Sequence, residues 1–176
     1  MRACRSRLVI AVRPGAGSGL LSQVLRQYSG PESELVSTRQ RADAVRQGIA
    51  GAALVCVGSD DLTGLQGVEL GEEFSVVLLP KNHRLAGRAG VAADLEGEPG
   101  YRAQCTESRL DEIMDRVAHG RLVTVVGSAA TDRLPSEVSA VPVTDLPPTT
   151  LALCWLSGTS TPGLPALVGR RAPGSC

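Results

Sequence analysis

The sequence predicts an α/β protein built on a parallel sheet, and three observations lead to that prediction. Short, continuous apolar segments rich in β-branched residues, such as Leu8 to Val12, are typical of strands buried on both faces. These segments alternate with amphipathic helical segments, as expected when right-handed crossovers join parallel strands. Aromatic residues make up only 2% of the 176 residues, so Leu, Val and Ala must build the core, which favours layered helices and sheets.

The first strand, helix and strand follow one another directly. The strand at 8–12 ends in a loop rich in Gly and Pro over 13–19. Ser18 in that loop can cap a helix whose apolar face runs from 20 to 28. A weaker strand is predicted at 34–37.

A second helix follows, and either Ser37 or Thr38 can cap it. Gly48 lies near the predicted end of this helix. Its inward-facing residues are predicted to be Ala42, Val45 and Ile49. Buried strands are then predicted at 52–57 and 74–79.

The second half of the chain contains the strongest helix signal. Apolar residues recur at helical spacing over 110–118, with Ser108 at the start and Gly120 at the end. A buried strand at 122–126 runs into Gly127-Ser128, where another short helix can begin. The remaining predicted elements are strands at 138–143 and 151–156 and a last helix at 162–168.

Charge and hydropathy exclude several classes of protein. Eighteen basic and eighteen acidic residues cancel, so no overall field attracts nucleic acid or anionic lipid. No segment approaches the roughly 18 apolar residues of a membrane span. The apolar run after the basic N-terminus is too short for a signal peptide. We therefore expect a soluble, cytoplasmic protein without membrane partners.

Residues that would carry catalysis or bind metal do not form a recognisable pattern. The five cysteines are widely spaced, without a CxxC pair, and the two histidines have no metal-ligand spacing. Asp60-Asp61 is interpreted as a solvated pair in a turn. The sequence therefore predicts no metal, no cofactor and no enzymatic activity.

Several motifs, in this order, resemble those of LysR-type transcriptional regulators. Residues 78–86, Leu-Leu-Pro-Lys-Asn-His-Arg-Leu-Ala, followed by Val-Ala-Ala-Asp-Leu at 91–95, are similar to the family's P-x-x-H-x-L-A and v-x-x-x-D-L elements. Weaker similarity extends over 45–56, 68–74 and 112–126. The resemblance covers residues 7 to about 170 and concerns the effector-binding domain alone.

The resemblance implies a two-lobed fold like that of the type 2 periplasmic binding proteins, with two small doubly wound sheets and a ligand cleft. Lobe I would comprise residues 7–80 and 144–170, and lobe II residues 81–143. The chain would cross between the lobes at hinge residues Pro80, Lys81, Val143 and Thr144. The segment between Leu95 and Leu110 is shorter than usual in the family, which leaves open a trimmed second lobe.

The same fold predicts the place of a binding site, because open α/β sheets bind ligands beyond the carboxyl ends of their strands. The predicted effector-binding residues follow three strands: Arg13, Gly17, Ser18, Ser37, Thr38, Gly127 and Ser128. Their hydroxyls and free N–H groups suit a carboxylate or another polar metabolite.

The function implied by the resemblance is effector sensing in transcriptional control. The alternative is a stand-alone binding protein or an enzyme on the same scaffold. The family's N-terminal helix-turn-helix domain is absent from this sequence. By the resemblance, DNA would be bound only through such a domain. The sequence leaves open whether the chain is an isolated domain, a truncated product or a complete protein without DNA binding. The resemblance also implies a homodimer.

Overall fold

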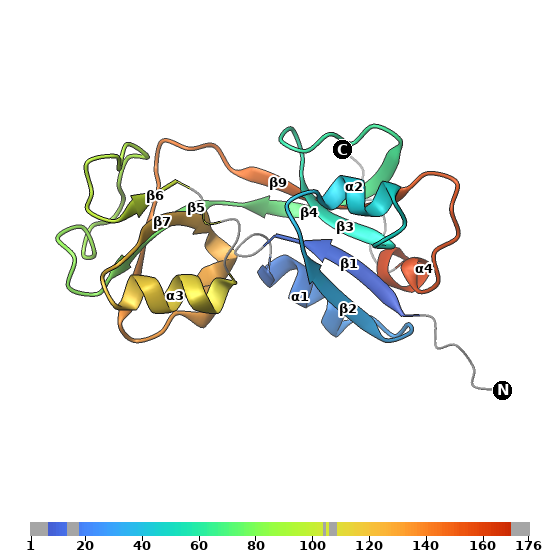
Figure 1. Ribbon diagram of the computed structural model, residues 1–176, viewed down its shortest axis with the longest axis horizontal. Coiled ribbons are helices and arrows are strands. Elements are labelled where there is room, and N and C mark those ends of the chain that lie inside the picture. The colour runs from blue at the N-terminus through green and yellow to red at the C-terminus, as the bar shows by residue number, and fades with distance from the viewer. Residues whose placement is uncertain (1–6, 14–17, 104, 106–108, 170–176) are drawn as a thin grey trace. The chain divides into compact units, whose positions relative to one another are not determined.

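The computed structural model describes residues 7–13, 18–103, 105 and 109–169 (Figure 1). In chain order the elements are β1 (Leu8–Val12), α1 (Ser18–Arg26), β2 (Ser33–Ser37), α2 (Arg41–Arg46), β3 (Ala52–Cys56), β4 (Leu65–Glu73), β5 (Ser75–Pro80), β6 (Tyr101–Arg102), α3 (Leu110–Ala118), β7 (Val123–Gly127), the 3₁₀ helix η1 (Ser128–Arg133), β8 (Val138–Pro142), β9 (Thr149–Leu156) and α4 (Leu164–Val168). The chain forms two compact units. Unit 1 contains the first strand, residues 20–71 and the end of the chain from 150, and unit 2 is built mainly from residues 72–149.

Unit 1 is organised around a five-stranded sheet in the order β2-β1-β3-β9-β4. Strand β1 pairs in parallel with β2 on one side and with β3 on the other, as the alternation of strands and helices predicts. The late strand β9 then runs antiparallel to β3, so the sheet is mixed. All five residues of β3 are buried, which explains its continuous apolar sequence.

Helices cover both faces of this sheet. On one face, Leu21 of α1 and Leu164 and Leu167 of α4 belong to the same buried cluster as strand residues such as Ile10 and Leu153. On the other face, Ala44 and Val45 of α2 pack with the small strand residues Ala11, Ala53 and Ala152. Large residues therefore gather on the side of α1 and α4, and small residues on the side of α2. Figure 1 shows α1 and α2 on opposite sides of the sheet.

Unit 2 contains a four-stranded sheet in the order β6-β7-β5-β8. Strand β5 lies at its centre and pairs antiparallel with both β7 and β8. Ile113, Met114 and Val117 of α3 cover one face. On the other face, the connecting segment after β5 contributes Leu85, Val91 and Leu95 to the core. One face of this sheet is thus covered by a loop in place of a helix.

Most predicted elements are present at their predicted positions, and the helix ends are especially close. Gly48 and Gly120 follow α2 and α3 by two residues and have φ angles of 72° and 68°. This left-handed conformation is the one that favours glycine after a helix. Ser108, the predicted start of α3, lies outside the described residues.

The structure also differs from the sequence predictions. Ile49 was predicted to face inward, but 59% of its surface is exposed, because α2 ends at Arg46 and the following turn points Ile49 outward. Strands β4 and β6 were not predicted. Four of the nine residues of β4 are solvent-exposed, and the strand contains two glycines and three glutamates. Strand β6 has only two residues, so neither strand has a clear apolar pattern.

The boundaries of the two units also differ from the predicted lobes. Residues 75–80 were assigned to lobe I, but β5 is the central strand of the second sheet. From residue 20 onward, the chain passes between the units at Gly71–Glu72 and at Thr149–Thr150. The apolar sequence of β5 shows that it is buried, but it carries no information about which sheet it joins.

Candidate functional site

Three predicted site residues lie together at the carboxyl ends of the parallel strands in unit 1. The register of β1 and β2 places Val12 opposite Ser37, so Arg13 and Thr38 are the next residues beyond that pair. The Thr38 N–H donates to the Val12 carbonyl oxygen at 3.0 Å. Ser37 is exposed, and Arg13 and Thr38 are half-buried. These three residues therefore present polar groups to solvent at one edge of the sheet.

The hydroxyl of Thr38 has a local structural role. It accepts a hydrogen bond from the Gln40 N–H at 3.2 Å. Gln40 directly precedes α2 and makes no capping bond with its side chain, so neither Ser37 nor Thr38 caps this helix as predicted. Two further residues form a turn before the helix begins, and the Thr38 hydroxyl stabilises that turn.

The predicted residues after β1 can be placed only in part. Gly17 lies outside the described residues. Ser18 is the first residue of α1, so this helix begins where the sequence predicts, but the side chain of Ser18 is also outside the described part.

A buried ion pair at the same edge of unit 1 was missed in the sequence. Arg41, the first residue of α2, donates from Nη2 to both carboxylate oxygens of Asp60, each at 2.8 Å. The exposed fraction is 5% for the Arg41 side chain and 16% for that of Asp60. The Cys56 N–H, at the end of β3, donates to the same carboxylate at 2.8 Å. Asp60 is therefore not the solvated turn residue that the sequence predicted, whereas its neighbour Asp61 is exposed.

This pair leaves one buried polar atom without a partner. The Nε of Arg41 has no hydrogen-bond partner within the described part of the chain. Because Asp60 already neutralises the guanidinium, the pair adds no net charge to this edge. Arg41 thus anchors the start of α2 to the loop after β3.

The predicted site residues of unit 2 lie beside a buried carboxylate. Glu73, the last residue of β4, has 6% of its surface exposed. Its Oε1 accepts a hydrogen bond from the Ala129 N–H at 3.1 Å. The Ser128 N–H donates to the Phe74 carbonyl oxygen at 2.7 Å. The N–H groups that were predicted to bind a ligand after Gly127 are therefore used within the chain.

A second cluster of ionisable groups fixes the segment after β5. The Glu98 side chain, 7% exposed, lies 3.3 Å from His83 Nε2 and also accepts a hydrogen bond from Arg84 Nη2. The Leu85 N–H donates to His83 Nδ1 at 3.2 Å, so the ring proton belongs on Nε2, facing Glu98. Burial, and then the charge of Arg84, lower the pKa of His83. The imidazole is therefore neutral at pH 7 and donates to Glu98.

No group of three or more His, Cys, Asp or Glu side chains within the described ranges is placed so as to hold a metal ion. Across those same ranges, no helix is long and apolar enough to cross a bilayer.

Comparison with models of known families shows to which family the chain belongs. A family model described as the LysR substrate binding domain matches residues 3–116. The chain belongs to this LysR substrate-binding domain family. A search of curated protein sequences finds no match.

Solved structures show the same fold as this LysR substrate-binding domain. The reduced form of the OxyR regulatory domain from Pseudomonas aeruginosa has a TM-score of 0.70 at 19% identity, covering 93% of this chain and 95% of that one. A variant of full-length OxyR from the same species has a TM-score of 0.72 at 18% identity, covering 92% and 68%. CbnR, a LysR family transcriptional regulator, has a TM-score of 0.71 at 11% identity, covering 93% and 68%. These likenesses confirm the predicted two-lobed α/β fold.

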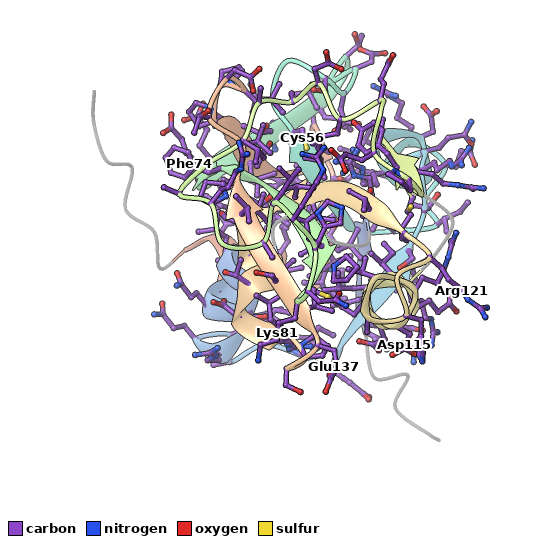
Figure 2. All side chains as sticks on the ribbon, turned by 90° about the vertical axis from the view of Figure 1, so that its left-hand side faces the viewer. Cys56, Phe74, Lys81, Asp115, Arg121 and Glu137 are labelled. Atoms are coloured by element: carbon purple, nitrogen blue, oxygen red, sulfur yellow. The ribbon has the colours of Figure 1, made fainter. Side chains whose placement is uncertain are left out.

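The residues expected as hinges of the LysR substrate-binding domain lie inside unit 2. Pro80 ends β5, and the Lys81 N–H donates to the Glu137 carbonyl oxygen at 2.9 Å. Lys81 and Glu137 lie at the same end of the unit, well away from Phe74 (Figure 2). The N–H groups of Val143 and Thr144 donate to Ser75 and Val91 within the same unit. All four residues therefore stabilise unit 2, and none is at a point where the chain changes units.

The described cysteines are part of the packing. Cys56 and Cys154 are buried in the first sheet, and Cys105 packs partly against the core of unit 2. Burial, and then the negative charge of Asp60, raise the pKa of the Cys154 thiol. A raised pKa reduces the thiolate fraction and hence the reactivity of this cysteine.

A small pocket is present in unit 1, away from the predicted site residues. Its volume is about 70 Å³, and it lies between α1, β4, β9 and α4. Its lining residues are Gln23, Val24, Gln27, Val68, Leu70, Leu153, Ala166, Leu167 and Val168. The cavity is much smaller than the roughly 300 Å³ at which ligand pockets begin.

Proposed function

We propose that this chain is the effector-sensing part of a LysR-type transcriptional regulator and that it binds a small polar or anionic metabolite to control transcription. The match of the LysR substrate binding domain to residues 3–116 is the observation that carries the proposal. The domains of this family and the structural neighbours belong to transcriptional regulators, which supports a sensor over an enzyme. A transcriptional regulator acts where the DNA lies, so the proposed location is the cytoplasm.

The effector site is proposed at the carboxyl ends of the strands. In unit 1, Arg13, Ser37 and Thr38 combine a positive charge, two hydroxyls and solvent exposure at one edge. Gly17 and Ser18 remain part of this predicted site. The position of the effector between two lobes stays a prediction.

The proposal includes two partners, DNA and a second copy of this chain. CbnR has been solved in complex with its target DNA, and 68% of its length is covered by this chain. We propose that DNA binding by the present protein requires a helix-turn-helix domain, and that this chain forms a homodimer.

A thermal-shift screen against a metabolite library tests the proposed function. A metabolite that raises the unfolding temperature and is recovered unchanged supports a sensor. If a metabolite is converted, the protein is an enzyme on this scaffold. If none of a broad set of polar metabolites binds, effector sensing by this chain is contradicted.

Variants at two of the predicted site residues then locate the site. Ser18→Gly removes a hydroxyl at the start of α1 at little cost to the helix, and Thr38→Val removes the hydroxyl of Thr38. Each variant is expected to weaken binding of a charged effector by about ten- to a hundredfold. Ser136→Ala, at an exposed position of unit 2, is the matched control for loss of a hydroxyl. Unchanged affinity in both Ser18→Gly and Thr38→Val would place the site elsewhere.

A further inference from the structure

Strand β2 forms one edge of the sheet in unit 1, and its pairing with β1 shows which of its backbone groups are unpaired (Figure 1). At the start of the pairing, the Leu8 N–H donates to the Glu32 carbonyl oxygen at 2.9 Å. At its end, the Thr38 N–H donates to the Val12 carbonyl oxygen at 3.0 Å. Because alternate residues of a parallel strand bond to the same neighbour, the even-numbered residues face β1. The residues that direct their N–H and C=O groups away from the sheet are Ser33, Leu35 and Ser37.

These three residues, which we call the free edge, are open to another strand. Their backbone groups have no hydrogen-bond partner within the described part of the chain. All three residues are exposed. Leu35, at the centre, has 50% of its surface exposed, so a large apolar side chain lies beside the unpaired groups. An edge of this kind is a template for pairing with another strand.

The other three sheet edges have features that hinder such pairing. Strand β4 contains three glutamates, and its Gly71 has a φ angle of 149°, far from regular strand geometry. Strand β8 is paired in part with the segment after β5, since the Val91 N–H donates to the Pro142 carbonyl oxygen at 2.9 Å. Strand β6 has only two residues. By contrast, β2 contains no proline, glycine or lysine, and its one charged residue, Glu34, forms an ion pair with Arg7 at 2.8 Å.

We propose that the free edge is the dimerisation surface of this chain and pairs antiparallel with the same edge of a second copy. The inference rests on the homodimer that is part of the proposed function, and it names the surface of that dimer. A two-fold axis at Leu35 places this residue opposite its own copy and Ser33 opposite Ser37. In an antiparallel pair, such opposed residues exchange two hydrogen bonds at every second position. Every N–H and C=O group of the free edge therefore has a partner in this register.

The side chains of β2 are compatible with this register. The two Leu35 side chains meet at the axis and bury apolar surface, and serine hydroxyls lie opposite each other on the same face. On the other face Glu34 lies opposite Val36, so the two carboxylates are not directly opposed. An axis at Glu34 would oppose these carboxylates and place Ser37 opposite Pro31, which has no N–H. The sequence of β2 therefore favours an axis at Leu35 over one at Glu34.

Exchange of charges at Leu35 tests both the surface and the register. Leu35→Lys and Leu35→Glu should each raise the dissociation constant of the dimer by about tenfold or more, because like charges would be opposed at the axis. A 1:1 mixture of the two variants should form a heterodimer, in which opposite charges meet. Sedimentation velocity measures the mass of each sample at the same total concentration. Ile49→Lys changes an exposed apolar residue outside the free edge, and this matched control should remain a dimer.

Amide hydrogen exchange of the wild-type protein keeps the test decisive if the Leu35 variants do not fold. The Leu35 N–H should exchange about tenfold more slowly, or slower still, in the dimer than after dilution to the monomer. The Glu34 and Val36 N–H groups, which face β1, should be protected at both concentrations.

Two results would overturn the proposal and leave a homodimer through another surface. One is that folded Leu35→Lys and Leu35→Glu remain dimers, and the other is that exchange of the Leu35 N–H does not depend on concentration. A wild-type protein that is monomeric at every concentration would overturn the proposal together with the homodimer. None of these results alters effector binding, which the thermal-shift screen measures independently.

Discussion

One guanidinium nitrogen of Arg41 binds both carboxylate oxygens of Asp60, at 2.8 Å each, although the two residues are separated by a helix and a strand. The pair fixes the start of α2 to the loop after β3 at the edge where the predicted unit 1 site residues lie. The pair therefore fixes the position of α2 relative to β3 at that edge.

Breaking this pair should strongly destabilise the fold. Asp60→Ala leaves the Arg41 charge buried without a counterion, which we expect to cost about 3–5 kcal/mol in the free energy of unfolding. Asp61→Ala, at the exposed neighbouring position, should cost less than about 1 kcal/mol. Urea denaturation measures both. Equal costs for the two variants would show that the buried pair does not stabilise the domain.

The neutral state of His83 should make stability depend on pH. Its pKa in the folded protein is lowered from the ordinary value of 6.5 by burial and by Arg84. The stabilisation is then present above that ordinary value and is lost as the pH falls through the lowered pKa. The free energy of unfolding of wild type relative to His83→Asn should thus decrease between about pH 7 and pH 5.

A control for this pH series is available at the end of α3. His119→Asn removes an imidazole from an exposed position and corrects for general effects of the substitution. Glu98 opposes the lowered pKa of His83, because its charge favours a protonated ring. If Glu98 dominated over burial, the difference between wild type and His83→Asn would grow as the pH falls.

The exposed position of Ile49 can be tested against the buried position of Val45. Ile49→Ser should change the free energy of unfolding by less than about 0.5 kcal/mol, because 59% of the residue surface is already in contact with water. Val45→Ala creates a cavity between α2 and the sheet and should cost about 1–3 kcal/mol. A large decrease in the free energy of unfolding for Ile49→Ser would contradict the exposed position of Ile49 and support the inward position that the sequence predicts.

The isolated chain should not bind DNA with sequence specificity. Its formal charge is zero, so any association with DNA should be weak, with a dissociation constant of about 1 μM or higher, and should disappear as salt is added. A gel-shift assay at physiological salt measures this. Nanomolar binding that depends on the DNA sequence would contradict the prediction.

The chain should associate into dimers in solution, as the resemblance to the family implies. Light scattering over a range of concentrations is expected to give a mass near twice that of the 18.3 kDa chain. A monomer at the highest concentration would contradict this prediction.

Much of the fold could be predicted from local sequence, because burial on both faces leaves a continuous apolar pattern. Strands β1 and β3 and helix α3 were predicted to within two residues, and Gly48 and Gly120 marked two helix ends. Strand pairing is not a local property. The sequence of β5 shows burial but not its position at the centre of the second sheet, so the predicted lobe boundary at residue 80 did not match the observed units.

The candidate site was less predictable, since its important contacts join residues far apart in the chain. The proximity of Arg13, Ser37 and Thr38 could be predicted because they lie at the ends of neighbouring strands, and their role in binding stays a prediction. The pairing of Asp60 with Arg41 and the contact of Glu73 with Ala129 span 19 and 56 residues. One local signal did exist for the second contact. Gly127 is the last residue of an apolar strand, and a glycine within a strand can mark a close approach by another group.

The strand order of unit 1 also determines the order in which the two units can fold during synthesis. All four strands of the second sheet lie between residues 75 and 142, so unit 2 can complete its sheet while the ribosome is still adding the last residues. The first sheet must wait, because β9 at 149–156 inserts between β3 and β4, which were made much earlier. Until then the backbone N–H and C=O groups at the facing edges of β3 and β4 remain unpaired and open to other chains. A nascent chain is therefore most prone to aggregation just before β9 leaves the exit tunnel.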